Sequence, residues 1–370
     1  MARVRGLLCV FTASAAIAAL PAAGGCGGGT STPGAGGAGG VAADAGTGGA
    51  AGPGGTGGAG SGGSAGAPAD AAPDSADVSS EAGADSADSA SPDAGGACTP
   101  CTDYAPATQT GRVQTAALNA LSGIAVSHRN PGVLFVHNDH ERPEFWAVSE
   151  TGALLASFTY TGATVRDVED IAVGPCPSGT CVFLADIGGN LAARPDYTIV
   201  RLPEPAVALT GSAAPVTIAA DKLVFTYPDG AQHNAESLMI DPRSGTPYII
   251  DKVAAGLPST AYRLSATFGG AAIVATKLMQ LPVPKAGDQP ATAADAHPCG
   301  TGFILRTGNV AYEFRIAATA PFEDAFKATP VAVPAAQEQQ SEGISYQPDG
   351  RGFFTDSEGS MQPINFTACR

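Results

Sequence analysis

The chain has 370 residues, a formal net charge of −15 and a hydrophobic content of 44%. Much of the negative charge lies between residues 27 and 97, where there is no lysine or arginine, so the rest of the chain is only mildly acidic. No cluster of lysine and arginine follows, which argues against nucleic-acid binding and against an electrostatic membrane patch.

Residues 1–25 are predicted to be an export signal. Arg3 and Arg5 give a positive start, and residues 7–20 form an apolar run that is too short to span a bilayer as a lone helix. No later stretch is long and apolar enough to be a transmembrane helix. We therefore expect the segment to be removed during export.

The end of this segment, Leu20-Pro-Ala-Ala-Gly-Gly-Cys26, resembles a bacterial lipobox, with Ala23 where such sequences usually have a larger aliphatic residue. The resemblance implies cleavage before Cys26 and lipidation of that cysteine. Gly27 is similar to the residue found in lipoproteins sorted to the outer membrane. We therefore expect an anchor in the outer membrane, facing the periplasm or the cell surface. An ordinary secretory signal, cut near residue 22 or 23, is the alternative.

Residues 26–97 are predicted to be a disordered tether. The segment after the cysteine consists mainly of Gly, Ala, Ser, Pro and Asp and has no aromatic residue, so it cannot bury enough apolar surface to offset its ordering entropy. Its acids repel one another and extend the chain. A calcium-binding acidic repeat is the alternative, but these acids have no fixed period: Asp44, Asp70, Asp74, Asp77, Glu81, Asp85, Asp88 and Asp93.

A repeat of about 50 residues runs through residues 98–370, which we predict to form an all-β domain. Short apolar runs alternate with Gly, Pro and Asp turns, and no long amphipathic pattern interrupts them. We predict a five-bladed β-propeller, in which a strand near 111–118 completes the last blade and closes the circle. A sixth blade remains possible if residues 203–221 hide strands, and a β-sandwich is the alternative fold. The predicted first runs of the five blades are 121–126, 168–173, 236–240, 292–296 and 342–346.

Six cysteines remain after Cys9 and Cys26, and an even set in an exported chain predicts disulfides. The Cys98-x-x-Cys101 pair lacks a βαβ context and a second ligand pair, so neither a redox motif nor a zinc site is expected. We predict a Cys176–Cys181 bridge within one hairpin. Two further bridges should join Cys98 and Cys101 to Cys299 and Cys369, in a pairing that the sequence leaves open.

Three glutamates begin equivalent runs of the repeat, at Glu169, Glu236 and Glu342. Strand starts in the innermost position line the mouth of a propeller channel, where converging carboxylates repel unless something neutralises them. A hard cation with oxygen ligands would do so, with calcium as the first candidate, and acids tied to backbone N–H groups are the equally weighted alternative. A second column is predicted at the ends of the second runs: Asn138 or Asp139, Asp186, Asp251, Arg306 and Asp356, with Arg306 as a counter-charge.

Other titratable residues give weaker indications. His137 and His140 flank one polar loop and could form a transition-metal site or a general base, although surface histidines are the commoner case. A raised pKa on Asp167, Glu169 or Asp170 could supply a general acid. Alternation along a strand separates Glu169 from Asp170, so Glu169 is preferred. The chain has no nucleophile-elbow or zinc-helix motif.

Several phrases resemble a family of secreted bacterial β-propeller proteins, most of them uncharacterised, over about residues 112–370. They begin at Val168 (VEDIA), Ala185 (ADIGGN), Ala235 (AESL) and Ser341 (SEGIS). More distantly, the chain is similar to phytase-like, gluconolactonase-like and NHL-type propellers, which also place acids around a channel. In phytase-like propellers such acids hold calcium ions that bind phosphate with the help of basic residues. The few basic candidates here, Lys252, Arg306 and Arg194, argue against phosphate chemistry.

We therefore predict a monomeric binding module, tethered to a lipid bilayer, that presents one propeller face to a small-molecule or protein ligand, with a cation at the acidic mouth. The alternative is a metal-dependent hydrolase of the phytase-like or lactonase-like type that uses Glu169, Glu236 and Glu342. Nothing in the sequence identifies the ligand or substrate.

Overall fold

The computed structural model describes residues 100–189, 194–210 and 214–370. The predicted signal, the lipidation site at Cys26, the tether and Cys98 lie outside this part of the chain. Within it, strands make up five sheets, and a single 3-10 helix, η1 (Phe322–Lys327), lies between β18 (Ala311–Arg315) and β19 (Val331–Val333). No helix of the described residues is long and apolar enough to cross a membrane.

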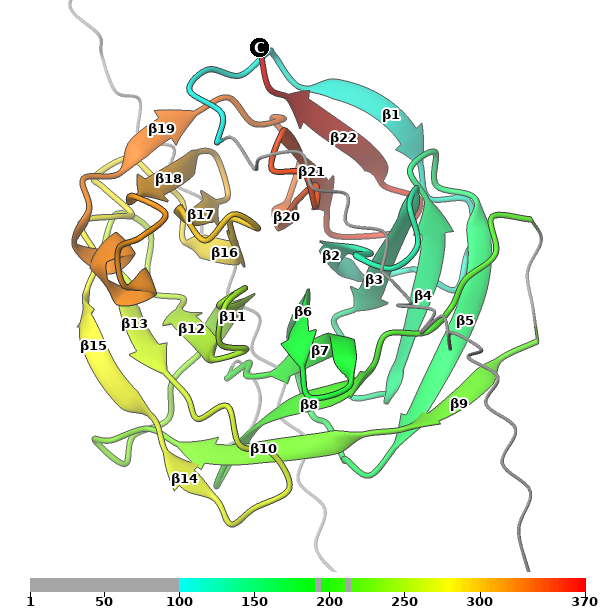
Figure 1. Cartoon of the computed structure of the whole chain (residues 1–370), viewed down its shortest axis with the longest axis horizontal. Coiled ribbons are helices and arrows are strands. Elements are labelled where there is room, and N and C mark those ends of the chain that lie inside the picture. Colours follow the sequence, from blue (N-terminus) through cyan, green and yellow to red (C-terminus); the bar gives the residue numbers. More distant parts are fainter. Residues whose placement is uncertain (1–99, 190–193, 211–213) are drawn as a thin grey trace, which may run out of the picture. The chain divides into compact units, whose positions relative to one another are not determined.

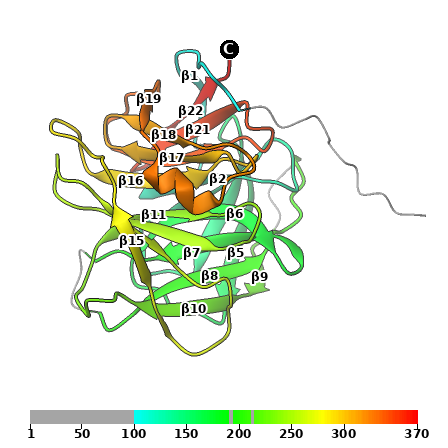
Figure 2. The ribbon, with the colours of Figure 1, turned by 60° about the vertical axis from the view of Figure 1, so that its left-hand side comes forward.

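The five sheets are the blades of a five-bladed β-propeller (Figure 1), as predicted. In each blade, consecutive strands pair antiparallel from the centre outward, and Figure 2 shows β7, β8 and β10 following one another through blade two. Blade one contains β2 (Leu121–Val126), β3 (Val133–Asn138), β4 (Glu144–Ser149) and β5 (Leu154–Thr161), and blade two contains β6 (Val168–Cys176), β7 (Gly179–Asp186), β8 (Tyr197–Pro203) and β10 (Asp221–Thr226).

The last three blades follow the same plan. Each of the innermost strands β2, β6, β11, β16 and β20 contacts the innermost strand on either side, so the ring is closed. The strands of these blades are β11 (Ala235–Ile240), β12 (Pro247–Asp251), β13 (Thr260–Arg263), β15 (Thr276–Gln280), β16 (Ala291–Ala296), β17 (Gly302–Thr307), β18 (Ala311–Arg315), β19 (Val331–Val333), β20 (Ser341–Tyr346), β21 (Gly352–Ser357) and β22 (Pro363–Ala368).

An N-terminal strand closes the circle, but it lies earlier than predicted. The outer strand of blade five is β1 (Thr108–Arg112), which pairs antiparallel with β22. The predicted strand at 111–118 was wrong in its bounds because Val113 and Leu118 leave the sheet. Both side chains are fully buried in the core that blades one and five share, and this burial explains their apolar character.

Two outer strands come from segments that join the third and fourth strands of one blade, and each pairs with the preceding blade. The stretch 203–221, which could have hidden a sixth blade, contains only β9 (Val216–Ala219) among its described residues, and β9 pairs parallel with β5 as a fifth strand of blade one. In the same way, β14 (Ile273–Val274) pairs parallel with β10 of blade two. These short strands cover edges that would otherwise expose unpaired backbone groups.

The hydrophobic core lies between neighbouring blades. Phe135 and Phe145 of blade one pack edge to face, with ring centroids 5.9 Å apart. They belong to one buried cluster with Val182 and Leu184 of blade two. Each blade therefore buries both faces of its sheet, which is why its inner strands carry almost unbroken apolar runs instead of a polar alternation.

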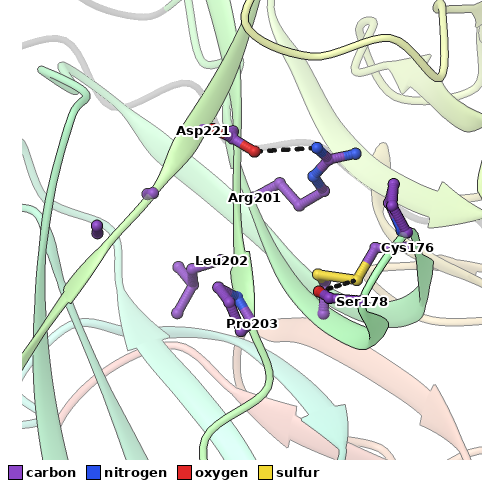
Figure 3. Close-up of a pocket in the computed structure, with 10 residues that line it drawn as sticks. Cys176, Ser178, Arg201, Leu202, Pro203 and Asp221 are labelled. Carbon is purple, nitrogen blue, oxygen red and sulfur yellow. Dashed lines mark hydrogen bonds and ion pairs between the residues drawn. A yellow bond between two sulfur atoms is a disulfide. The ribbon is translucent and has the colours of Figure 1, made fainter. Parts of the chain in front are cut away.

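Two disulfides agree with the predictions and indicate an oxidising environment. Cys176 and Cys181 are bridged in the turn between β6 and β7, beside a cavity of about 260 Å³ that Arg201 and Asp221 also line (Figure 3). Cys101 is bridged to Cys369 at the end of the chain.

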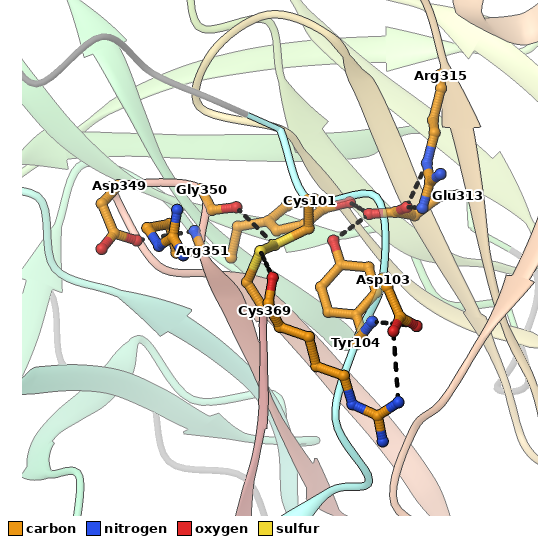
Figure 4. The surroundings of a disulfide bond; sticks show 11 residues. Cys101, Asp103, Tyr104, Glu313, Arg315, Asp349, Gly350, Arg351 and Cys369 are labelled. Carbon is orange, nitrogen blue, oxygen red and sulfur yellow. Dashed lines mark hydrogen bonds and ion pairs between the residues drawn. A yellow bond between two sulfur atoms is a disulfide. The ribbon is translucent and has the colours of Figure 1, made fainter.

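The Cys101–Cys369 bridge fastens the N-terminal segment to the closing blade (Figure 4). Next to it, the Tyr104 hydroxyl donates a hydrogen bond of 2.5 Å to the Glu313 carboxylate, and Tyr346 donates another of 2.6 Å. Cys299 also takes part in a disulfide. The chain ends of the propeller are thus held to blades four and five by covalent and polar contacts.

Candidate functional site

The start of every innermost strand contains a β-bulge. In each blade the register of the first two strands shifts at this point, so that one more residue lies on the innermost strand than on its neighbour. Such an extra residue leaves the hydrogen-bonded ladder and its side chain is re-aimed. The bulge position is occupied in turn by Ser122, Glu169, Glu236, Thr292 and Glu342.

The predicted column of strand-start residues is therefore a column of bulge residues. Two members that are not acids each donate a hydrogen bond to the bulge residue of the next blade. The Ser122 hydroxyl donates to the backbone carbonyl of Glu169 at 3.4 Å, and the Thr292 hydroxyl donates to that of Glu342 at 3.2 Å. The five bulge residues thus lie at the same end of the ring of innermost strands, which we call the mouth.

A repeated backbone hydrogen bond defines two further positions at the mouth. In every blade, a residue just after the second strand, at the strand-end position, donates its N–H to the carbonyl of the residue two before the bulge, at the lead position. The N···O distances run from 2.8 to 3.2 Å. The strand-end residues are Asp139, Gly188, Lys252, Gly308 and Glu358, and their lead residues are Ala120, Asp167, Asn234, Pro290 and Gln340.

Three carboxylates converge where blade one meets blade two. Asp139 from blade one and Asp167 and Glu169 from blade two each offer a carboxylate oxygen, and these oxygens all lie within 4.8 Å of one another. Asp139 is half-buried, whereas Glu169 is only 5% exposed. Glu169 Oε1 has no hydrogen-bond partner among the residues that the structure describes. This is a donor set suited to a hard cation.

Gly188 leaves the space between these carboxylates free of protein side chain. A Cβ atom added to Gly188 would collide with Glu169 Oε1 and Asp167 Oδ2. Both of these atoms are the far ends of side chains that could move aside, so a larger residue would displace the carboxylates without forcing the backbone apart. Glycine at this position therefore preserves the arrangement of the three acids.

Lys252 provides the positive charge of the mouth. Its ammonium forms an ion pair with Glu236 Oε2, and Asn234 Nδ2 donates to Glu236 Oε1 at 3.3 Å. Burial lowers the pKa of Lys252, but the carboxylates of Glu236, Glu342 and Glu169 outweigh that effect and raise it overall. Lys252 therefore stays protonated and offsets part of the negative charge.

Negative charge at the mouth exceeds what one lysine can balance. Burial, followed by repulsion from Glu236 and Asp139, raises the pKa of Glu169 well above its ordinary value. Burial also raises the pKa of Glu342 to about 9, with Lys252 opposing the shift. Ionising all these groups together is unfavourable unless a proton or another cation joins them.

Two acids of the second predicted column, Asp186 and Asp251, accept hydrogen bonds from backbone N–H groups. Asp186 Oδ1 accepts the N–H groups of Arg166 and Asp167 at 3.0 and 2.8 Å, and its other oxygen pairs with Arg194. Asp251 accepts the N–H of Thr260 at 2.6 Å. These two acids therefore fit the alternative prediction, in which the acids are held by backbone N–H groups. Neither of them belongs to the three-carboxylate cluster.

Blades four and five differ from the predicted register by one residue. Thr307 and Ser357, rather than Arg306 and Asp356, pair with the residues that precede the bulges of these blades. Asp356 instead accepts the N–H of Gly343 at 2.8 Å, inside the bulge of β20.

Arg306 is neutralised by a different acid from those predicted. Its guanidinium forms a fully buried ion pair with Glu338, in the segment before β20, and also donates to the carbonyl of Gly343 at 3.3 Å. Among the residues that the structure describes, Lys252 is the cation that pairs with a glutamate of the ring.

Asp170 lies directly after the bulge and is buried. Its carboxylate accepts the N–H of Ile171 at 2.8 Å and that of Leu238, on β11 of the next blade, at 2.7 Å. Asp295 makes a similar tie from blade four to blade five, accepting the N–H of Tyr346 at 2.8 Å. These two acids hold neighbouring blades together, which agrees with the preference for Glu169 over Asp170.

The two predicted histidines do not act as a pair. His137 is fully buried, and its Nδ1 lies 3.0 Å from the carbonyl oxygen of Asn138. Burial lowers its pKa to about 4, so it is neutral at physiological pH. His140 instead contacts Asn119 Oδ1 at 3.1 Å through Nε2. His137 belongs to the packing between β2 and β3.

Replacing Asp356 by asparagine is expected to reduce the loss of stability at high pH. Burial, then the neighbouring Glu338, raises the pKa of Asp356 from its ordinary value of 3.8 to about 8. The folded state therefore holds this proton more tightly than the unfolded state. The resulting stability is fully present below pH 3.8 and is lost as the pH rises to about 8, by about 1.4 kcal/mol for each pH unit.

Urea denaturation at pH 5, 6.5 and 8, without divalent cations, measures this effect. The asparagine variant keeps an acceptor for Gly343 but has no proton to lose. We expect its free energy of unfolding to fall less steeply with pH than that of the wild type. Parallel curves for the two proteins would contradict the assignment.

No protein-family model matches the sequence, and no similar sequence was found among curated proteins. The candidate site therefore rests on the geometry of the mouth. Of the residues at the mouth, Gly188 was not predicted from the sequence, because site residues were predicted from their charged side chains. Asp167 was predicted only as a possible general acid, and its place two residues before Glu169, as Asn234 precedes Glu236, was not recognised as a ligand position.

Proposed function

We propose that this chain is an exported, lipid-anchored β-propeller that acts as a binding module, and that its mouth holds one hard divalent cation, with calcium as the first candidate. Asp139, Asp167 and Glu169 would be the protein ligands, and the bound ion would organise the face that a ligand or partner meets. The disulfides support export to an oxidising compartment. The lipid anchor at Cys26 is inferred from the sequence.

One observation carries the proposal. Glu169 places a buried carboxylate oxygen, without a hydrogen-bond partner among the described residues, beside two other carboxylates. A buried charged oxygen without a partner is costly, and structural acids of this propeller, such as Asp186 and Asp251, avoid the cost by accepting backbone N–H groups. A hard cation would satisfy Glu169 in a comparable way.

Cation binding can be measured by calorimetry and thermal denaturation of the purified protein with calcium, magnesium or manganese. At a free calcium concentration 100 times the Kd, mass action adds about 2.7 kcal/mol, which is expected to raise Tm by about 5–10 °C. Gly188→Ala should abolish both the heat of binding and the shift, because its Cβ displaces two ligands while removing none.

Gly270→Ala is the matched control. Nothing lies within 4 Å of a Cβ added at Gly270, so this variant should bind the cation like the wild type. Glu169→Gln should weaken binding as Gly188→Ala does. A wild-type protein that gives no heat and no thermal shift with any of the three cations would overturn the proposed function.

The metal-dependent hydrolase remains a second candidate because of Glu342. Its side chain is 9% exposed at the mouth, and a pKa of about 9 would keep it protonated as a general acid near neutral pH. Cation-dependent cleavage of phosphate esters or lactones, lost in Glu342→Gln while calcium still binds, would favour this candidate over a binding module.

A further inference from the structure

Blades two and three present the same frame at the mouth with different residues. In both, the strand-end N–H donates to the lead carbonyl, at 3.2 Å in blade two and 2.9 Å in blade three, and the bulge residue is a glutamate. Blade two carries Asp167, Glu169 and Gly188 at the lead, bulge and strand-end positions. Blade three carries Asn234, Glu236 and Lys252.

The strand-end side chain points at the bulge glutamate of its own blade. In blade three, Lys252 places its ammonium on Glu236 Oε2. In blade two, a side chain built on Gly188 would run into Glu169 Oε1. The ammonium of Lys252 next to Glu236 is thus the counterpart, in the repeat, of a cation bound next to Glu169.

The lead residues of the two blades also differ in charge. Blade two has an aspartate at this position, so two carboxylates of the same blade face the space beside Gly188. Blade three has Asn234, whose amide donates to Glu236 and adds no charge. The two carboxylates of blade two would balance the charge of a divalent ion. The single carboxylate of blade three balances the charge of one ammonium.

We propose that Lys252 is a built-in cation which occupies the blade-three counterpart of the metal site and thereby limits the mouth to one divalent ion. This inference rests on the proposed function, because it assumes that blade two binds such an ion. Lys252 is also close enough to interact electrostatically with Glu169, so its charge opposes binding of the divalent ion next to it. Lys252 therefore sets both the stoichiometry and the affinity of the mouth.

A purely structural Lys252–Glu236 ion pair makes a different prediction. Removing such a pair changes the stability of the protein but leaves the number of bound ions unchanged. A built-in cation predicts that its removal creates a second site and that a lysine placed at Gly188 closes the first one. Stoichiometry is therefore the readout that separates the two roles.

The test is calorimetry of the full domain with calcium and magnesium. The wild type should bind one ion, and Lys252→Gly combined with Asn234→Asp should bind two, with the affinity of the first site increased about tenfold. Gly188→Lys should bind none at blade two and should unfold at the same temperature with and without calcium. Lys327→Gly, which removes an exposed lysine from η1, is the control and should bind one ion.

The outcomes separate this inference from the proposed function. A wild type that binds no ion overturns the proposed function, and this inference falls with it. A wild type that binds one ion, together with a Lys252→Gly, Asn234→Asp variant that also binds only one with unchanged affinity, overturns this inference alone. Gly188→Lys is compared with Gly188→Ala, which also loses the ion. A lysine that replaces the ion should make the lysine variant more stable than the alanine variant. Equal stability of the two would overturn this inference alone, even if the loss of Lys252 prevents folding.

Discussion

Replacing Glu338 by alanine is expected to lower the free energy of unfolding by about 3–5 kcal/mol. The side chains of Arg306 and Glu338 are 1% and 2% exposed, so the variant would leave a guanidinium buried without its counter-charge. Glu338 also accepts hydrogen bonds from Thr355, at 3.0 Å, and from Asn365, at 2.5 Å. Urea denaturation at pH 7 measures the loss.

The effect is large because this acid joins the last two blades. Arg306 belongs to β17 of blade four, whereas Thr355 and Asn365 belong to β21 and β22 of blade five. Blade five is also the sheet that contains both chain ends of the propeller, as β1 and β22. Loss of Glu338 would therefore weaken the contact at which the ring is closed.

Two further variants test whether burial is the cause. Glu323→Ala removes the acid of the Arg263–Glu323 pair, whose side chains are 42% and 36% exposed, and should cost less than about 1 kcal/mol. The double variant Arg306→Met, Glu338→Leu removes both charges and should recover much of the loss. Equal losses for Glu323→Ala and Glu338→Ala would contradict the argument.

The periodic part of the molecule could be predicted from the sequence. Each blade buries both faces of its sheet, so the apolar runs recur at nearly constant spacing and are visible without a structure. Glu169, Glu236 and Glu342 were found in the same way, because a repeated backbone frame places its bulge at the same point in every repeat. The sequence reports the column but not the bulge itself.

The non-periodic part could not be predicted, because it depends on single-residue offsets and on contacts between distant segments. Arg306 was predicted to lie at the mouth. The strand pairing in blade four is shifted by one residue from the prediction, and Arg306 forms its ion pair with Glu338 instead. Strands β9 and β14 form only where a connecting segment meets a neighbouring sheet. Gly188 contributes to the mouth because it has no side chain that would displace Glu169 and Asp167, and this role depends on contacts that the sequence does not show.

Removal of the Cys101–Cys369 bridge by alanine at both positions is expected to lower the free energy of unfolding by about 5–6 kcal/mol in the chain-entropy picture. These cysteines are 268 residues apart, so the bridge restricts most of the unfolded domain. The same substitution at Cys176 and Cys181, which are 5 residues apart, should cost about 2 kcal/mol.

Urea denaturation of the two double variants under oxidising conditions gives the comparison. In the chain-entropy picture, the cost grows with the logarithm of the loop that a bridge closes, so the order of the two losses is fixed by sequence separation. Because Cys299 also takes part in a disulfide, the long-range loss would shrink if that bridge restricts an overlapping loop. A larger loss for Cys176–Cys181 than for Cys101–Cys369 would show that native contacts in the β6–β7 turn, rather than restriction of the unfolded chain, determine the contribution of these bridges.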